Sequence, residues 1–267
     1  MASRVSQARK AFASGDIRQS INAHSRAAIR EQIHGEEKDE HGQYIGEFVY
    51  GAIDGTVTTF AVVSGATGAA LSPGIVIILG FANLLADGFS MACGNFLSER
   101  AQRDYIDRER KREAWEIEHL PEGERLEIEE IYRKKGFRGK DLKRAVSIIT
   151  SDKKTWIETM MADEIGLLDS PKVPWKTAAL TYFGFISIGI IPLLAFVFSH
   201  FFPPLNAITF KLAIGMTLVA LAIIGVVKRH ITKKNVWMSM IETLFIGGAA
   251  AVISYYIGFL LRWIVTL

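Results

Sequence analysis

The sequence contains a single cysteine, Cys93, among 267 residues, and this scarcity limits the sites that it can hold. One thiol excludes an intrachain disulfide framework and a zinc site built from several cysteines. Several motifs are also missing: the phosphate-binding G-x-x-x-x-G-K-[ST], the dinucleotide-binding glycine fingerprint, H-E-x-x-H and the G-x-S-x-G of serine hydrolases. We therefore predict that the protein is not an enzyme and has no organic cofactor.

The chain also lacks a strong excess of charge of either sign. It has 31 Lys and Arg against 28 Asp and Glu, a net charge of +3, which does not indicate a nucleic-acid partner. Yet 49% of the residues are hydrophobic and the mean hydropathy is +0.21, which is high for a chain with 22% charged residues. This combination predicts that apolar and charged residues are segregated between two solvents.

The apolar residues gather in five long runs, each near or above the roughly 20 residues that a helix needs to cross a bilayer. Asp54 and Asp87 interrupt the first two runs, whereas the last three are more uniformly apolar. The polar N-terminus carries no cleavable signal pattern. We predict an all-α membrane protein with five transmembrane helices in contact with the lipid bilayer. The predicted spans are 47–70, 74–97, 175–199, 207–227 and 237–265.

A charged block, 99–173, separates the second span from the third and holds 17 Lys and Arg and 18 Asp and Glu. Apolar residues recur in it at three- and four-residue spacing, which is typical of helices. We predict a three-helix domain inserted between the spans, with a further short helix near 140–149. The predicted helices are 99–118, 122–135 and 152–167. The predicted domains are 1–45, 46–98, 99–173 and 174–267.

Basic residues are distributed unevenly among the loops. Seven lie in the N-terminal segment, 17 in the charged block and four in 228–234, whereas the loops between these on the opposite side, GATGAALSP and HFFPPLNA, have none. The positive-inside rule then places the N-terminus and the charged block in the cytoplasm. Five spans put the C-terminus outside the cell or in a lumen.

Ionisable residues inside spans are costly and by default indicate function. Asp54 and Asp87 lie at similar depths on antiparallel spans, so they could face one another. Asn83, Asp87 and Met91 are spaced i, i+4, i+8 on one helix face, and Thr58 lies one turn from Asp54. The stripe predicts a cation path, although hydrogen bonding between helices is an alternative role. Small residues on the first span predict close helix packing: Gly51, Gly55, Gly65 and Gly68.

The charged block contains two i, i+3 pairs of glutamates on either side of Pro121, followed by a Met-Met-x-x-Glu sequence. Such spacing places the carboxylates of each pair on one helix face, and converging helices would bring carboxylates and thioethers together. This mixture favours Fe²⁺, Mn²⁺, Co²⁺ or Zn²⁺ over Ca²⁺. The candidate ligands are Glu113, Glu116, Glu124, Glu127, Met160, Met161 and Glu164.

Simpler interpretations exist for these groups. The glutamates could form a solvated helix face, and the two methionines could belong to a core. The basic partners would then be Arg110, Arg112, Arg125 and Arg133. A second acidic cluster, His34–His41, is interpreted as a solvated linker, and residues 1–33 as an amphipathic or surface helix.

Three motifs together resemble one family in their order along the chain. They are FVYGAIDGTVTTFAVVSGATGA in the first span, ANLLADGFSMACGNFLSERA in the second, and the block sequences REAWE, LPEGERLEIEEIY and ETMMADEIGL. Over about 42–265 the sequence is similar to the vacuolar iron transporter family, in the branch that has the cytoplasmic metal-binding domain.

The resemblance implies a homodimeric five-helix transporter that exchanges Fe²⁺ for protons and moves iron out of the cytoplasm. It matches Asp54 and Met91 to the translocation path and all seven candidate ligands to the cytoplasmic domain. Asn83 and Asn95 stand where some members have acids, so proton coupling would depend on Asp54 and Asp87. The choice between Fe²⁺ and Mn²⁺, and between a bacterial plasma membrane and a vacuolar membrane, stays open.

Two other functions compete with transport. A membrane-anchored metal sensor or buffer would use the block alone and would not need the polar stripe in the spans. A membrane di-iron oxidoreductase would use the glutamates, but the block lacks a Glu-x-x-His pair, and its one histidine is His119.

Overall fold

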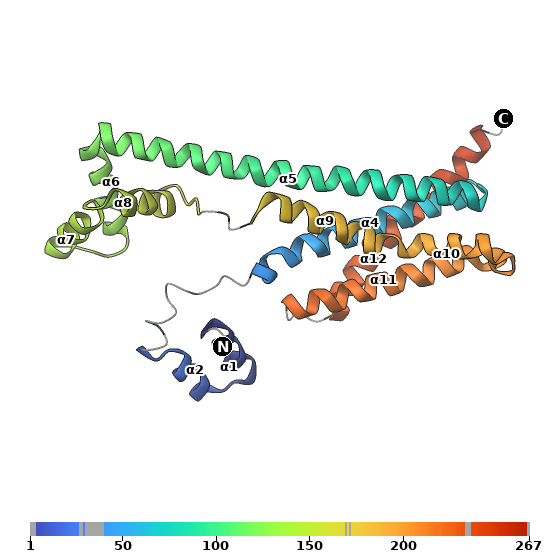
Figure 1. Cartoon of the computed structure of the whole chain (residues 1–267), viewed down its shortest axis with the longest axis horizontal. Helices are drawn as coiled ribbons and strands as arrows, with labels where there is room; N and C mark the ends of the chain where they lie inside the picture. Colours follow the sequence, from blue (N-terminus) through green and yellow to red (C-terminus); the bar gives the residue numbers. More distant parts are fainter. Residues whose placement is uncertain are drawn as a thin grey trace. The chain divides into compact units, whose positions relative to one another are not determined.

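The computed structural model describes residues 4–26, 29, 40–168, 170, 172–232 and 236–265. All the regular secondary structure in these ranges is helical, which confirms the predicted all-α class. The chain divides into two compact units, 1–46 and 47–267 (Figure 1).

The first unit contains α1 (Arg4–Ser14) and α2 (Ile17–Ala23), where the sequence predicted one amphipathic or surface helix. Gly15, with φ +67°, separates them, and the Asp16 side chain caps α2 by accepting hydrogen bonds from two backbone amides. Most of the predicted linker, His34–His41, lies outside the described residues; its last two positions begin the next helix.

Four helical segments of the described chain are long and apolar enough to cross a membrane. They lie in α4 (Glu40–Gly68), in α5 (Pro73–His119), in η2 (Pro203–Ile208) with α11 (Thr209–Thr232), and in α12 (Val236–Val265).

A fifth candidate is a bent pair, α9 (Pro174–Gly189) and α10 (Ile191–Phe201), whose axes differ by 42°. Pro192 lies in the first turn of α10, where its missing N–H and its ring prevent a straight continuation of α9. The number of candidate spans is therefore four, or five if the bent pair crosses once.

The helix α5 differs from the prediction, which separated a span at 74–97 from a helix at 99–118. The structure has one uninterrupted helix of 47 residues, about 70 Å long at 1.5 Å per residue. The sequence Ser-Glu-Arg-Ala-Gln at 98–102 contains no helix breaker, so the change from apolar to charged residues does not end the helix. The helix ends at His119, and its C-cap residue is Leu120, directly before Pro121.

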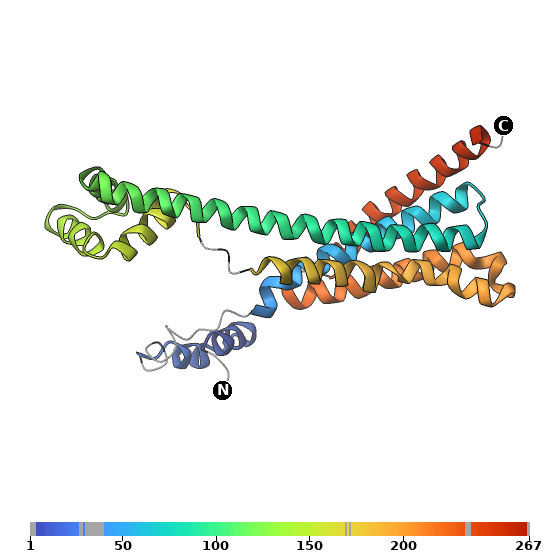
Figure 2. The ribbon, with the colours of Figure 1, turned by 45° about the horizontal axis from the view of Figure 1, so that its top comes forward.

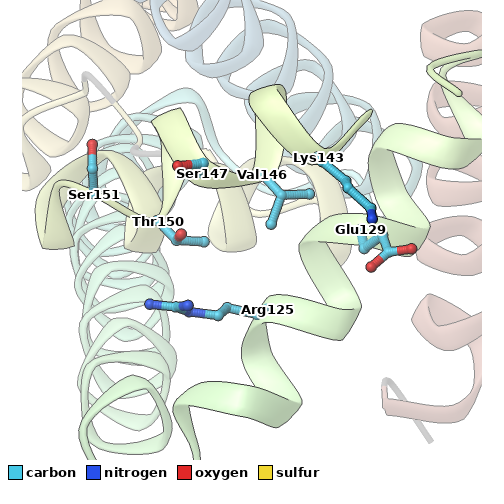
Figure 3. Close-up of a pocket in the computed structure, with 7 residues that line it drawn as sticks. All are labelled: Arg125, Glu129, Lys143, Val146, Ser147, Thr150 and Ser151. Carbon is cyan, nitrogen blue, oxygen red and sulfur yellow. The ribbon is translucent and has the colours of Figure 1, made fainter. Parts of the chain in front are cut away.

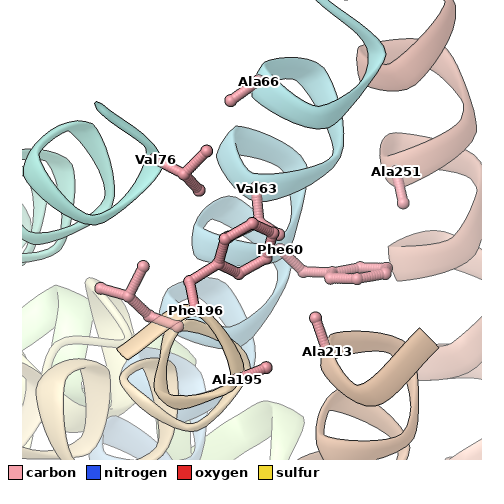
Figure 4. Packing of buried hydrophobic residues seen from close by; sticks show 9 residues of the cluster. Phe60, Val63, Ala66, Val76, Ala195, Phe196, Ala213 and Ala251 are labelled. Atoms are coloured by element: carbon pink, nitrogen blue, oxygen red, sulfur yellow. The ribbon is translucent and has the colours of Figure 1, made fainter. Parts of the chain in front are cut away.

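The glycines of α4 permit the close packing that the sequence predicted. A Cβ atom at Gly51 or Gly55 would overlap the backbone of α9, and one at Gly68 would overlap the backbone of α12. Beyond the midpoint of α4, Phe60 and Val63 join Val76 of α5 and Phe196 of α10 in a buried apolar cluster (Figure 4). These contacts fix α4 against its neighbours within one chain.

The charged block folds against the C-terminal end of α5, as Figures 1 and 2 both show. Its own core contains Ile117, Ile128, Ile149, Trp156 and Met160. The predicted helices correspond to the end of α5 and the segments that follow it, including the short helix near 140–149. These segments are α6 (Pro121–Lys134), α7 (Gly139–Ile149), α8 (Lys153–Thr159) and the π-helix η1 (Met160–Glu164).

Candidate metal centre

Three carboxylates meet at the turn between α5 and α6. Glu113 and Glu116 lie on one face near the end of α5, and Glu124 lies in the first turn of α6. Leu120 and Pro121 end one helix and begin the next, so α6 turns back toward α5. Each side chain offers an oxygen, and these oxygens lie within 4.8 Å of one another. That spacing suits a shared divalent cation.

The other predicted ligands surround this group to different extents. The exposed Glu127 and Glu164 lie near enough to influence the buried carboxylates electrostatically. Met160 and Met161 are buried, at 0% and 2% exposure, and η1 contacts both α5 and α6. Met160 also packs in the block's apolar core, as the simpler interpretation expected. Its role as a ligand stays a prediction, as do those of the other six residues.

Burial sets the electrostatics of the cluster. The Glu113 side chain is 1% exposed, and within the described chain its two oxygens and Oε2 of Glu124 accept no hydrogen bond. The pKa values of Glu113 and Glu124 are raised to about 7, mainly by burial and in part by the neighbouring carboxylates, and Arg112 offsets some of the rise at Glu113. The pKa of Glu164 is also raised, mainly because the surrounding protein removes part of its carboxylate's hydration and then because of Glu127. The buried members are therefore partly protonated near neutral pH when no cation is present.

Repulsion within the cluster is substantial. Two full negative charges about 5 Å apart repel by about 3 kcal/mol at an effective dielectric constant of about 20. A divalent cation would relieve this repulsion and supply partners for the oxygens that accept no hydrogen bond. Residues of this kind at this spacing can bind a metal ion. The carboxyl groups would release their protons as the ion binds.

The arginines of the block form ion pairs with different sets of glutamates. Arg112 approaches the cluster: its guanidinium lies 2.6 Å from Glu113 and 2.5 Å from Glu116. Arg133 instead pairs with Glu129 and Glu130, outside the cluster. The simpler interpretation, a solvated face of paired charges, therefore describes the second half of α6, whereas the cluster itself is partly buried.

In the membrane helices, the four predicted path residues are half-buried on α4 and α5. Asp54 and Asp87 lie near enough to interact electrostatically, and their facing one another across a path stays a prediction. The Nδ2 atom of Asn83 is buried without a hydrogen-bond partner in the described chain. The Thr58 hydroxyl donates to the backbone carbonyl of Asp54 at 2.8 Å, so its proton is engaged within the helix. The fourth path residue is Met91.

A polar network that the sequence analysis missed joins three of these helices. Asn95 of α5 donates to the hydroxyl of Thr181 on α9 at 2.7 Å and to Glu47 of α4 at 3.4 Å. Lys172 binds the other oxygen of Glu47 at 2.7 Å. Glu47 was a lone acid at the edge of an apolar run, and its partner Lys172 is 125 residues away, so spacing alone could not connect them.

The block also has a pocket of about 390 Å³ between α6 and α7, which shares no residue with the carboxylate cluster (Figure 3). Arg125 and Lys143 line it with three hydroxyl side chains, and Glu129, its one acid, pairs with Arg133. Two cations and one neutralised acid do not suit a metal ion. The cluster at the α5–α6 turn is therefore the better candidate for a cation site.

Comparison with known proteins identifies the family of this chain. The sequence profile of the VIT family matches residues 45–259. A protein of Toxoplasma gondii named vacuolar iron transporter is 35% identical over 270 residues, which cover 97% of this chain and 89% of the relative. Vacuolar iron transporter 1 of Arabidopsis thaliana is 31% identical over 223 residues, covering 83% and 88% respectively. The chain therefore belongs to the VIT family and is a multi-pass membrane protein.

Proposed function

We propose that the protein is a proton-coupled transporter that moves Fe²⁺ out of the cytoplasm after the carboxylate cluster captures it. The observation that carries this proposal is the continuity of α5. One helix holds Glu113 and Glu116 near its C-terminal end and Asp87 and Met91 in its apolar half, about 33 Å away between Met91 and Glu113. The relatives named vacuolar iron transporter support iron as the cargo.

The ligand types support a divalent transition metal as cargo. Carboxylates bind hard and borderline cations, and the thioethers of Met160 and Met161 favour Fe²⁺, Mn²⁺, Co²⁺ or Zn²⁺ over Mg²⁺ and Ca²⁺. The π-helix that carries both methionines is a rare element that occurs often at functional sites. Fe²⁺ is the principal cargo in this proposal and Mn²⁺ a second one.

Asp54 and Asp87 are the groups that exchange metal for protons in this mechanism. Two carboxylates in a low-dielectric region are costly to keep charged without a counter-ion. They hold the metal together with Met91 on the outward leg and take up protons on the return. Asn83 supplies an amide oxygen to the path. The Nδ2 atom of the same amide is buried without a hydrogen-bond partner in the described chain.

The orientation, membrane and assembly belong to the same proposal. The distribution of Lys and Arg supports a cytoplasmic N-terminus and charged block. The relatives' names favour a vacuolar membrane over a bacterial plasma membrane. The resemblance to the family favours a homodimer, and the exposed apolar side chains of α12, which include Tyr256, Leu260 and Trp263, are available to lipid or to a second copy.

A membrane-anchored metal buffer is the second candidate. The observation in its favour is that the three clustered carboxylates come entirely from the charged block. A buffer would bind metal without moving it and would leave the path residues without a purpose.

Transport by the purified full-length protein in proteoliposomes separates the two. Fe²⁺, Mn²⁺, Co²⁺ and Zn²⁺ are offered in turn while internal metal and internal pH are recorded together. The proposal expects Fe²⁺ flux accompanied by proton flux in the opposite direction. Metal binding with no flux for any of the four ions would establish the buffer instead.

A further inference from the structure

The guanidinium of Arg112 lies among three carboxylates near the end of α5. Its Nε is 2.9 Å from Glu109, its Nη2 is 2.6 Å from Glu113 and its Nη1 is 2.5 Å from Glu116. Two of these acids belong to the metal cluster, whereas Glu109 lies outside it. One cation therefore touches two of the three carboxylates that a metal ion would use.

The contacts differ in strength and in exposure. Glu113 is buried, and its contact with Arg112 does not have hydrogen-bond geometry, since neither Glu113 oxygen accepts a hydrogen bond in the described chain. The Arg112 side chain is 43% exposed, which leaves it room to move. Glu109, which is not a member of the cluster, accepts a hydrogen bond from Nε of Arg112 and is also bound by Arg108. Arg112 can thus leave the cluster and keep one hydrogen bond.

We propose that Arg112 is a built-in counter-ion that the incoming metal displaces, so that it weakens metal binding and speeds metal release. The proposal rests on the metal-capture function given above. Without a metal, the guanidinium stabilises Glu113 and Glu116 against their mutual repulsion. When the ion binds, Arg112 swings onto Glu109. The site then binds the ion loosely enough to pass it on, which a transporter needs and a storage site does not.

The structure offers a matched control in Arg108, one turn earlier on the same helix. It pairs with Glu109, at 2.9 Å, but with neither Glu113 nor Glu116. Arg108→Gln removes the same charge and two hydrogen bonds to Glu109, and it removes no contact to the three clustered carboxylates. Arg112→Gln removes the counter-ion, and Arg112→Lys keeps the charge but loses the planar fork.

The test is calorimetric titration of Co²⁺, an air-stable probe, into the purified full-length protein and the three variants. A chelator chase then gives the dissociation rate. Arg112→Gln should bind Co²⁺ about tenfold more tightly or better. A nearby cation lowers the proton affinity of a carboxylate by roughly 10- to 1000-fold, and it opposes a metal ion by the same repulsion. The dissociation of Co²⁺ from this variant should slow correspondingly. Arg112→Lys should fall between it and the wild type, and Arg108→Gln should stay within about twofold of the wild type.

Each other outcome counts against the proposal. Unchanged or weaker Co²⁺ binding by Arg112→Gln, with wild-type helix content by circular dichroism, overturns it and leaves the capture function standing. If Arg112→Gln does not fold, Arg112→Lys decides, and an affinity equal to that of the wild type refutes it. Failure of the wild type to bind Co²⁺, Fe²⁺ or Mn²⁺ overturns the capture function and this inference together.

Discussion

The two ends of α5 place acidic residues in contrasting surroundings. At the C-terminal end, oxygens of three carboxylates lie within 4.8 Å of one another beside Arg112, whose side chain is 43% exposed. In the apolar half, Asp87 lies near enough to Asp54 of α4 to interact with it electrostatically, and Asn83 and Met91 lie one turn away on the same helix. A dense cluster next to water holds enough negative charge to bind a cation from dilute solution. A sparse pair in hydrocarbon is suited to passing a cation on, because it holds less charge.

The largest effect on transport is expected from a substitution at the Asp54–Asp87 pair of the membrane helices. Asp54→Asn removes half of the paired charge in the membrane helices, so metal flux and proton flux in proteoliposomes should fall to the background of empty liposomes. Co²⁺ binding by the distant cluster should be unchanged. The control is Asp104→Asn, an exposed acid of α5 that pairs with Arg100. Residual proton-coupled flux in Asp54→Asn would remove this residue from the mechanism.

The cluster should lose affinity when its buried members are neutralised. Glu113→Gln with Glu124→Gln should weaken Co²⁺ binding about 100-fold or more, since even changes outside the coordination shell cost roughly 10- to 100-fold. Calorimetry on the full-length protein measures the change. Glu129→Gln with Glu130→Gln removes two acids that pair with Arg133 outside the cluster. An equal loss in both double variants would indicate general electrostatics and no defined site.

Acid should disable the cluster. The pKa values of Glu113 and Glu124 are about 7 in the folded protein, so both carboxyls bind protons as the pH falls through neutrality. Metal affinity should then fall by up to about tenfold per pH unit for each proton displaced. Titrations at pH 8, 7 and 6 measure it. The dependence should flatten in the variant with glutamine at both positions, and an equally steep dependence there would assign the protons to other groups.

The same pKa shifts also affect the stability of the metal-free protein. Metal affinity falls as the pH falls, whereas this stability falls as the pH rises. A carboxyl whose pKa is raised on folding stabilises the native state fully below its ordinary value near 4.5, and this contribution is lost as the pH rises through about 7. The metal-free block should therefore become less stable between about pH 5 and pH 8. Added Co²⁺ should restore stability at pH 8 more than at pH 5. Thermal unfolding followed by circular dichroism tests both statements.

A smaller effect compares the packing of α4 in the membrane helices with that of α6 in the charged block. Gly55→Ala places a methyl group against the backbone of α9 and should destabilise the protein by about 1–3 kcal/mol. At Gly123 of α6, a Cβ atom would meet nothing within 4 Å, so Gly123→Ala should stabilise helix α6 by about 0.5–1 kcal/mol. Apparent melting temperatures in detergent should move in opposite directions. A fall in both would contradict the packing described for the charged block.

Local signals in the sequence predicted much of this arrangement. Apolar runs and helical periodicity predicted an all-α membrane protein and the helices of the charged block, and the three motifs predicted the family. The i, i+3 spacing of Glu113 and Glu116 placed both carboxylates on one helix face, and the sequence indicated that they would meet Glu124 if the helices converge. The structure confirms that these three carboxylates meet.

The remainder depended on contacts that spacing does not encode. Four arginines were equal candidates to neutralise the glutamates, and only the packing of α6 and η1 onto α5 separates Arg112 from Arg133. The unbroken α5 was missed because the change in polarity at residue 99 resembled a domain boundary. The pair Glu47–Lys172 was missed because it joins distant parts of the chain.

The most direct test of the whole account is the metal dependence of the transport rate in proteoliposomes. If the cluster captures the ion and the path carries it, the variant with Glu113→Gln and Glu124→Gln should raise the KM for Fe²⁺ with little change in the maximal rate. Asp54→Asn should abolish the maximal rate. An unchanged KM in the first variant, or an undiminished maximal rate in the second, would contradict the division of labour between the two ends of α5.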